Sequence, residues 1–404
     1  MAVKPKLALI PSGVGVDKLY SVLPSDGTGD FTFDRNLNTA TRINKDGLIE
    51  MVDADVPRLN YPLIDGVVSG CPSLLLEPES RNLITYSEDF NNPSWNKSNT
   101  GTGVLPIVNT NQIISPDGTL SADELIFNSG GGTTTSDRSV LDILFTVNTG
   151  NDYTGSIWLK GKNNGDQILL GQLSGGYELI TLTTEWVRYE FTQAASTSPR
   201  HFNIGIRQNI FGIINDTVEV YAWGAQLEEQ SYATSYIPTS GSQATRSAET
   251  CTGAGDANTF NDSEGVLMAE IAKNKGNQYS LISLFKSSVS DTYIYMGYLN
   301  NTTTIRGQIK VGGTTVLDEE IEMADTNITA KVSVRYKSGD YSLYVNGLEV
   351  GSSSSTAIFT DGDLNELQFG FANNSIFDFY GNTKQLQYFD TALSDEELAL
   401  LTKI

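Results

Sequence analysis

The sequence predicts an all-β protein in which two tandem β-sandwiches follow an irregular N-terminal segment and a short helix ends the chain. Alternating apolar and polar runs recur between clusters of Gly, Asn, Asp and Ser, as is typical of strands and turns. Aromatic residues are plentiful (18 Tyr, 16 Phe and 4 Trp), and these side chains suit sheets better than helices. Helix signals are few.

The clearest strand patterns fall in two blocks of the chain. They cover residues 153–160, 186–191, 218–223, 331–336 and 341–345. Lys337-Ser-Gly-Asp340 predicts a hairpin loop between the last two of these strands. Asn346-Gly347 predicts a tight turn before a further strand at 348–350.

One helix is predicted, over residues 393–401. Ser394 has the character of an N-cap, and Glu397 stands three residues later, which is the spacing of a capping box. Leu398 and Leu401 are then expected to face inward.

The chain divides into three predicted parts. Residues 1–80 lack a sustained strand pattern and carry turn dipeptides such as Asp26-Gly27, so we expect them to pack against the next domain or against sister chains. Residues 81–240 and 241–404 are strand-rich. Pro238-Thr-Ser-Gly-Ser-Gln243 has the composition of a linker between them.

The charge balance restricts the partners of this protein. Its 404 residues contain 26 Lys plus Arg against 48 Asp plus Glu, a net charge of −22. A surface this negative repels phosphate backbones and anionic lipid, so we expect no nucleic acid partner and no membrane insertion. The N-terminus contains no signal-peptide core, and no apolar run approaches a membrane span.

Residue counts also restrict the chemistry. The single histidine, His201, excludes a multi-histidine metal centre, and no partner for it is evident. With two cysteines, Cys71 and Cys251, the chain can form at most one internal disulfide and no zinc cluster. We therefore predict no cofactor other than calcium.

Several motifs resemble known families. The N-terminal part resembles the leader of bacteriophage fibre, spike and virion structural proteins, in Phe31–Arg35, Ala40–Glu50, Pro57–Tyr61, Ser73–Pro78, Arg81–Glu88 and Trp95. The middle block resembles a carbohydrate-binding-module jelly roll, in Tyr153–Gly161, Trp186–Phe191, Tyr221–Glu228 and Tyr236–Thr239. The last block resembles a laminin-G or concanavalin-A-like sandwich, in Tyr341–Gly347, Glu366–Gly370 and Leu386–Glu397.

These resemblances imply a non-catalytic virion protein, a head or tail fibre or a decoration protein. Residues 1–80 would attach it to other virion proteins and to sister chains, as a homotrimer. It would assemble in the host cytoplasm, and its sandwiches would face outward to bind host-surface glycans. Because that cytoplasm is reducing, we expect Cys71 and Cys251 to be unpaired and buried. Three alternatives stay open: a purely structural capsid or tail component, a polysaccharide depolymerase, and a secreted adhesin.

Aromatic residues on polar faces are the candidate sugar-binding residues. Alternation along 153–160 puts Trp158 on the face opposite Tyr153, Ile157 and Leu159, where it could stack on a sugar unless a loop or a neighbouring subunit covers it. Trp95 is a second candidate, with a plug beneath a loop as the alternative. Trp186 and Trp223 are expected in the core.

Acidic clusters are the remaining candidates. Asp361 and Asp363 lie in an oxygen-rich loop that could bind calcium, although the loop lacks a specific calcium motif. Glu320 and Glu322 share a strand face as glycosidase carboxylates do, but no aromatic residue flanks them, which favours a solvated strand edge. No catalytic residue is predicted.

Overall fold

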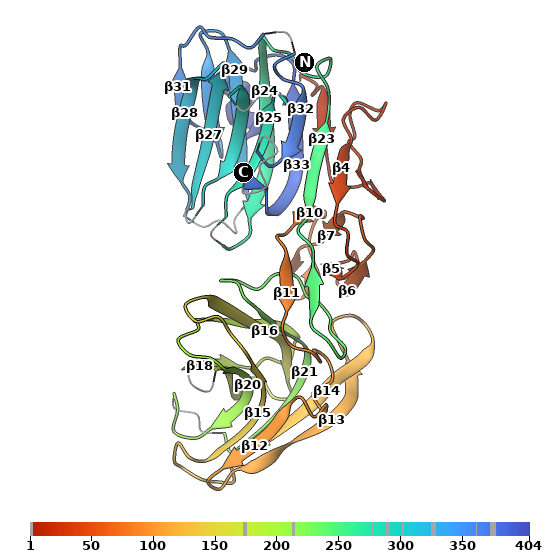
Figure 1. Ribbon diagram of the computed structural model, residues 1–404, viewed down its shortest axis with the longest axis vertical. Coiled ribbons are helices and arrows are strands. Elements are labelled where there is room, and N and C mark those ends of the chain that lie inside the picture. Colours follow the sequence, from red (N-terminus) through yellow and green to blue (C-terminus); the bar gives the residue numbers. More distant parts are fainter. Residues whose placement is uncertain are drawn as a thin grey trace.

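The fold is two stacked lobes of β-sheet, seen one above the other in Figure 1. The computed structural model describes residues 3–172, 176–211, 215–276, 278–287, 291–300, 303–324, 329–360, 362–371 and 377–404. The lower lobe is the predicted jelly roll, and the upper lobe is the predicted C-terminal sandwich. The all-β prediction is confirmed, with α1 (Asp395–Leu401) as the helix at the end of the chain.

The jelly roll consists of two five-stranded antiparallel sheets. The first has, in spatial order, β12 (Asn96–Thr100), β15 (Arg138–Phe145), β20 (Arg200–Arg207), β17 (Gln167–Gln172) and β18 (Gly176–Thr181). The second has β13 (Val104–Ile114), β14 (Leu120–Asn128), β21 (Thr217–Glu228), β16 (Asp152–Gly161) and β19 (Val187–Ala194). Alternate residues of both sheets meet in one core that includes Ile157, Leu159, Phe202 and Ile204.

The upper lobe is built from two larger sheets. The order of the first is β31 (Leu348–Ser353), β30 (Tyr341–Val345), β29 (Ala330–Lys337), β24 (Glu264–Lys273), β33 (Gly381–Phe389), β10 (Ser73–Leu76) and β7 (Arg58–Asn60), with β1 (Leu7–Leu9) also on β33. The order of the second is β2 (Val14–Gly15), β3 (Lys18–Leu19), β4 (Phe31–Asp34), β23 (Thr250–Ala254), β32 (Glu366–Phe369), β25 (Ser280–Phe285), β26 (Tyr293–Tyr298), β27 (Thr304–Val311) and β28 (Thr314–Glu322).

The N-terminal segment contributes to both sheets of this upper lobe. β1 and β10 share one edge of β33, through the pairs Leu7↔Tyr388 and Leu74↔Thr383, and β4 pairs with β23. Its strands are two to four residues long, too short to show a sustained pattern in the sequence. Their apolar side chains are nevertheless buried in the upper core: Leu7, Leu9, Phe31, Phe33, Leu74 and Leu76. We expected this segment to pack against the next domain or against sister chains. Its short strands pair instead with β33 and β23 of the C-terminal sandwich, which lies beyond the jelly roll in the sequence.

The jelly roll is therefore inserted between two parts of the upper sandwich. The chain enters it through β11 (Ser80–Asn82) and leaves through β22 (Ala244–Arg246), and these two strands pair antiparallel (Figure 1). The inserted part of the chain therefore runs from Ser80 to Arg246. Two small hairpins, β5 (Ala40–Ile43) with β6 (Ile49–Val52) and β8 (Leu63–Ile64) with β9 (Val67–Val68), lie outside the large sheets.

The predicted turns and the helix cap are confirmed. Asn346 and Gly347 both adopt positive φ, 52° and 86°, between the paired residues Val345 and Leu348, as a type I′ hairpin requires. Ser394 Oγ accepts from the Glu397 N–H, and the Glu397 carboxylate accepts from the Ser394 N–H. Leu398 is fully buried beneath this capping box.

We predict that residues 241–404 alone do not form the stable sandwich that they form in the whole chain. Without residues 1–80, one edge of β33 is bare and six buried apolar side chains are missing from the core. Loss of that burial costs about 1.5–3 kcal/mol per side chain, so the six side chains together cost about as much as the whole stability of a typical domain. The measurement is urea unfolding of the fragment against the full chain. A fragment with the same cooperative midpoint as the full-length protein would contradict this prediction.

Candidate functional site

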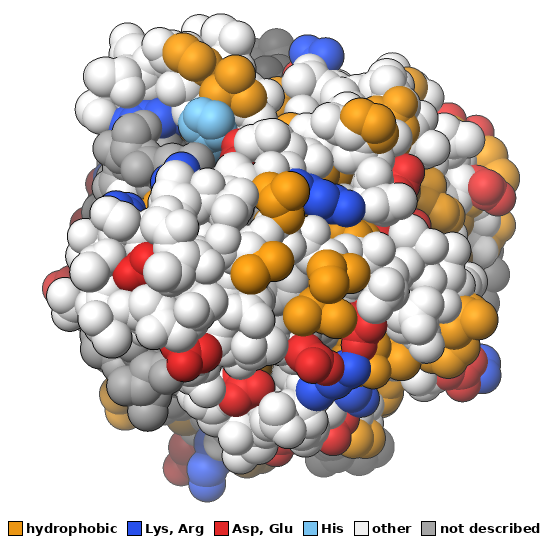
Figure 2. All heavy atoms as spheres, turned by 90° about the horizontal axis from the view of Figure 1, so that it is seen from below, with side chains coloured by type: hydrophobic (Ala, Val, Ile, Leu, Met, Phe, Trp, Pro, Cys, Tyr) orange, Lys and Arg blue, Asp and Glu red, His pale blue; other side chains and the backbone are white. Residues whose placement is uncertain are grey.

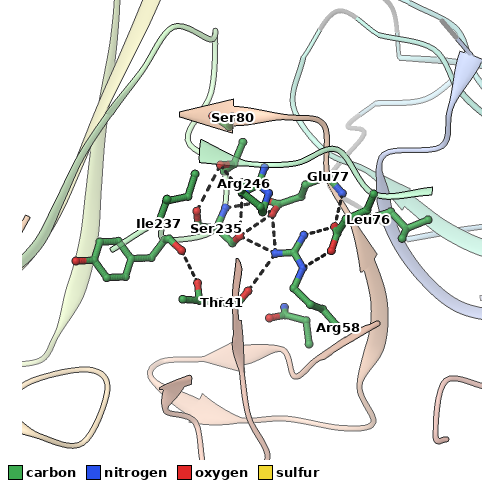
Figure 3. A network of polar contacts seen from close by, with 12 residues as sticks. Thr41, Arg58, Leu76, Glu77, Ser80, Ser235, Ile237 and Arg246 are labelled. Atoms are coloured by element: carbon green, nitrogen blue, oxygen red, sulfur yellow. Dashed lines mark hydrogen bonds and ion pairs between the residues drawn. The ribbon is translucent and has the colours of Figure 1, made fainter. Parts of the chain in front are cut away.

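A buried network of charged side chains lies where the two lobes meet (Figure 3). Arg58 of β7 binds Glu249 through Nε at 2.8 Å and through Nη2, and binds Glu77 through Nη1 at 2.8 Å. Arg35 also reaches Glu249, at 2.8 Å, and Arg246 of β22 reaches Glu77, at 3.1 Å. The side chains of these three arginines and two glutamates are 0–5% exposed.

The network continues into the jelly roll. Glu77 accepts hydrogen bonds from the Ser235 backbone N–H, at 2.8 Å, and from Ser235 Oγ, at 2.6 Å. Glu228, at the end of β21, accepts from the Thr234 N–H at 2.9 Å and from Ser80 Oγ at 2.5 Å. One set of polar contacts thus joins four parts of the chain: Glu77 just after β10, Ser80 of β11, Glu228 with the segment that follows β21, and Arg246 of β22.

The electrostatics of the network are those of a structural centre. Burial acts to raise the pKa of Glu77, but Arg246, Arg58 and the Ser235 hydrogen bonds outweigh it and lower that pKa to about 2. Burial also lowers the pKa of Arg35, against the attraction of Glu249. Removal of one partner from a buried ion pair costs about 3–5 kcal/mol, because the other charge is left unpaired in the interior.

An aromatic cluster with Trp158 lies beside this network. As predicted, Trp158 lies on the face of β16 opposite the core, and its ring is half-buried. The rings of Trp223 and Tyr236 each lie 5.5 Å from it, and the Arg188 guanidinium lies 4.4 Å above it. Ile49 of β6, from the N-terminal part of the chain, packs against the same cluster.

A cavity of about 190 Å³ remains beside Trp158. Its lining includes Thr41, Arg42, Asn60, Trp158, Arg188 and Tyr236, which come from both lobes. Within it, Arg188 Nη1 and Nη2 donate to Thr234 O and Ser156 Oγ, at 2.7 and 2.9 Å, while the buried Arg188 Nε has no hydrogen-bond partner. An aromatic wall with an unused donor beside it suits a small polar ligand with an apolar face.

The assignment of Trp95 as a sugar-binding residue is corrected by the structure. Trp95 is only 2% exposed, and its ring packs against Phe90 at 5.0 Å and Phe202 at 5.9 Å. Its Nε1–H donates to Tyr86 O at 2.9 Å. Since the ring has no free face and its donor is used, Trp95 is a plug in the jelly-roll core.

The other two tryptophans lie in the cluster around Trp158, outside the core between the sheets. Trp223 is buried, as expected, but on the outward side of β21, where Gly224 at φ 63° interrupts the strand alternation. Trp186 is only partly buried, and its Nε1–H donates to Ile114 O at 3.1 Å. The sequence pattern did not reveal this second aromatic centre, because the hairpin that covers it is remote in the chain.

The carboxylates considered for catalysis lie on a solvated strand. Glu320 and Glu322 are on β28, and Arg306 Nε lies 3.3 Å from Glu320 and 2.6 Å from Asp318. The hydrogen bond from Arg306 lowers the pKa of Asp318 despite partial burial. An arginine-paired carboxylate is held in its ionised form, which is unsuited to a general acid.

The calcium candidates are only partly described. Asp361 lies outside the described residues. Asp363 Oδ1 binds Lys286 Nζ at 2.6 Å, and its Oδ2 accepts from the Thr360 N–H and Oγ1, each at 2.8 Å. Among the described residues no group of three or more His, Cys, Asp or Glu side chains could hold a metal ion. Both oxygens of the Asp363 carboxylate are therefore already bound, one by Lys286 and the other by Thr360.

His201 has a partner that sequence reasoning missed. Its Nδ1 lies 2.7 Å from Asp142 Oδ2, and Asp142 Oδ1 accepts from Asn96 Nδ2 at 3.1 Å. These residues stand on three neighbouring strands, β20, β15 and β12. Only the register of the sheet brings them together, so no local sequence signal could have found them.

The two cysteines differ in exposure. Cys71 and Cys251 are both free; Cys251 is buried as expected, but Cys71 is exposed.

The surface of the jelly-roll end is mixed in character. Seen from below, it shows acidic, basic and apolar side chains among other side chains and backbone (Figure 2). Within the described ranges, no helix has the length and apolar character needed to cross a membrane.

Comparisons with known proteins identify the upper lobe. Residues 268–399, about a third of the chain, match the family model for the concanavalin A-like lectin/glucanases superfamily. No curated protein matches the chain. This match agrees with the concanavalin-A-like sandwich that the sequence predicts for this part of the chain.

Solved structures resemble parts of the chain at low identity. The CBM40 of the Ruminococcus gnavus IT-sialidase, bound to α2,3-sialyllactose, is 19% identical, covers 37% of this chain and 86% of its own, and has a TM-score of 0.32. Domain 4 of AbnA, a GH43 arabinanase of Geobacillus stearothermophilus bound to arabinotriose, is 13% identical, covers 43% and 81%, and also has a TM-score of 0.32. At these values no function follows from the likeness.

We predict that Glu77 makes the free energy of unfolding fall as the pH is lowered below 4.5. Its folded pKa of about 2 lies below its ordinary value of 4.5, so its contribution is present above pH 4.5 and is lost as the pH falls toward 2. The measurement is the urea midpoint between pH 6 and pH 2 for wild type and Glu77→Gln. We expect a shallower decline in the variant, with the exposed Asp46→Asn as control. Identical declines in wild type and Glu77→Gln would contradict the prediction.

Proposed function

We propose that this chain is a non-catalytic, glycan-binding protein of a bacteriophage virion, a head or tail fibre or a decoration protein. Its sandwiches would face outward and bind host-surface glycans. The observation that carries the glycan-binding part is the cavity of about 190 Å³ beside Trp158. An aromatic wall can pack on the C–H face of a sugar, while the free Arg188 Nε donates to a hydroxyl.

The size of the cavity favours one sugar unit at the end of a glycan. It lies below the roughly 300–1,000 Å³ of pockets that enclose a drug-sized ligand. Its walls come from β5, β7, β16, β19 and the segment after β21. Arg58 of the buried ion network joins β7 to Thr41 of β5 and to Ser235 of that segment. A site assembled from both lobes would therefore be rigid before the sugar arrives, which reduces the entropic cost of binding.

A non-catalytic role is supported by the state of the carboxylates considered for hydrolysis. Asp318 and Glu320 are paired with Arg306 on a solvated strand, and the aromatic cluster lies in the other lobe. A depolymerase needs a proton donor and a second carboxylate flanking one glycosidic bond. This pairing favours adhesion over hydrolysis.

The virion part of the proposal rests on the N-terminal resemblance and on an exposed apolar surface. Within residues 1–80, Val16, Ile64 and Val67 are 66%, 62% and 68% exposed. Ile64 and Val67 lie on the hairpin of β8 and β9, and Val16 lies between β2 and β3. Exposed apolar side chains of this kind suit contact with other virion proteins or with sister chains in a homotrimer. Assembly would take place in the host cytoplasm. Light scattering at micromolar concentration tests the trimer, and a monomeric mass would contradict it.

The glycan-binding proposal is tested by Trp158→Ala on a glycan array, followed by titration calorimetry with the glycans that bind. We expect binding to fall by at least about tenfold, or about 1.4 kcal/mol, because the aromatic wall is lost. Trp186→Ala is the matched control, since Trp186 belongs to the same cluster but does not line the cavity. Equal loss in both variants, or no binding by wild type, would favour a purely structural virion component.

A further inference from the structure

One side of the jelly roll is formed by two edge strands. β12 ends one of its five-stranded sheets and β13 ends the other, and within the described ranges no further strand pairs with the free side of either. The turn between them is tight, because the Gly103 N–H donates to Thr100 O at 3.0 Å. In Figure 1, β12 and the beginning of β13 lie at the lower end of the jelly roll, remote from the upper lobe.

This side of the jelly roll lacks charged residues over an unusual length. Residues 98–116, here called the uncharged edge, contain none, although the 18% of charged residues in the whole chain would place about three there. A second uncharged stretch, residues 125–136, touches the first, since Thr102 Oγ1 donates to Ser129 O at 2.8 Å. The Asp137 carboxylate beside them is buried and already accepts hydrogen bonds.

Apolar side chains are exposed on the uncharged edge. Val104, Leu105 and Ile107 are 49%, 51% and 52% exposed, and they follow one another closely on β13. A single exposed apolar side chain is ordinary, whereas a contiguous group of them indicates a surface that contacts a partner. Most of the other residues of the edge are Asn, Thr, Ser, Gln and Gly, which suit the polar rim of such a contact.

The geometry of β13 prevents open-ended strand addition at this edge. Register shifts interrupt its pairing with β14 within residues 104–107 and 109–113. Pro106, which has no N–H to donate, lies in the first of these stretches. In the second, the Asn111 N–H is already bound by Asp123 Oδ1, at 3.0 Å. Bulges and proline protect an edge strand from fibre formation, so a partner here is contacted mainly through side chains.

The charge of the chain indicates which partner fits the uncharged edge. Each copy carries a net charge of −22, so two copies repel each other over most of their surfaces. A basic partner would be bound through carboxylates, and residues 98–116 contain none. A second copy of this chain can approach this edge without bringing charges of the same sign together. The edge therefore fits another copy better than it fits a partner of opposite charge.

The dimensions of the edge are also adequate for a contact between copies. β13 has 11 residues, which at about 3.4 Å per residue gives a length of up to about 37 Å. The edge of the sandwich is about 20 Å wide, because the two sheets are about 10 Å apart and each has an outer layer of side chains. These dimensions give up to about 700 Å², close to the roughly 800 Å² that each partner contributes to a standard interface.

We propose that the uncharged edge is a contact surface between copies of this chain. Val104, Leu105 and Ile107 form the apolar centre of the contact, and the surrounding Asn and Thr side chains form its rim. The proposal rests on the association between copies that is part of the proposed function. It places a contact on the jelly roll, separate from the exposed hairpin of β8 and β9 in the N-terminal segment.

The test is sedimentation velocity of the full chain over a range of micromolar concentrations, for wild type and for the double variant Leu105→Glu, Ile107→Glu. We expect the dissociation constant of self-association to rise at least about tenfold in the variant, because carboxylates then face one another across the contact. Leu144→Glu is the matched control. Leu144 is also about half exposed, but it lies on β15, outside the edge, so this variant should associate as wild type does.

A second variant guards against misfolding of the first. Thr110→Glu adds a charge to an exposed position of the uncharged edge and removes no apolar side chain, and it should also weaken self-association. The urea midpoint of each variant, measured at a concentration at which wild type is dissociated, should equal that of wild type, because the substituted side chains are exposed.

The response to salt distinguishes this contact from one that depends on ion pairs. Added NaCl screens the repulsion between two chains of −22 each, so a rise from about 0.05 to about 0.5 M should strengthen the self-association of wild type. A contact through ion pairs would weaken under the same change, and that result would overturn the proposal.

The remaining outcomes separate this proposal from the proposed function. A wild type that is monomeric at every concentration would overturn both this contact and the homotrimer. Self-association that is unchanged in Thr110→Glu and in the double variant would overturn this contact alone. If Ile64→Glu on the β8–β9 hairpin then abolished the association, the hairpin would be the contact between copies and the uncharged edge would not.

Discussion

The interaction on which the rest of the molecule depends is the pairing of Arg58 with Glu249 and Glu77 in a fully buried setting. Charges taken out of water are tolerated only when every partner is in place. Here the partners come from the N-terminal segment, from the segment that follows β10 and from the segment that precedes β23. The network therefore ties together stretches of chain that are nearly two hundred residues apart.

This network also fixes the position of the inserted jelly roll relative to the upper lobe. β11 and β22 form only three cross-strand pairs, which alone would make a weak connection between the lobes. The hydrogen bonds of Glu77 with Ser235, and of Glu228 with Ser80 and Thr234, extend the connection into the jelly roll. An outward-facing surface on one lobe is then held in a defined position relative to the other.

The contacts between the two lobes also determine how exposed the aromatic cluster around Trp158 is. Trp158 points away from the core, as strand alternation requires, but Arg188 lies over its ring and the β5–β6 hairpin closes around the cluster. Trp158 is therefore one wall of a small cavity, whereas the sequence predicted an exposed ring on which a sugar could stack. The contact of His201 with Asp142 and of Asp142 with Asn96, by contrast, joins three strands that only sheet register places side by side.

The sequence by itself determined the local features. Period-two alternation predicted β16, β19, β21, β29 and β30, Asn346-Gly347 predicted the hairpin turn, and Ser394 with Glu397 predicted the helix, because each depends on residues within one strand or turn. Tertiary structure decided where residues 1–80 pack, that Trp95 is buried, and that His201 meets Asp142. Those outcomes depend on strand pairing between segments that are distant in the sequence. The residues of one strand do not specify which distant strand will pair with it.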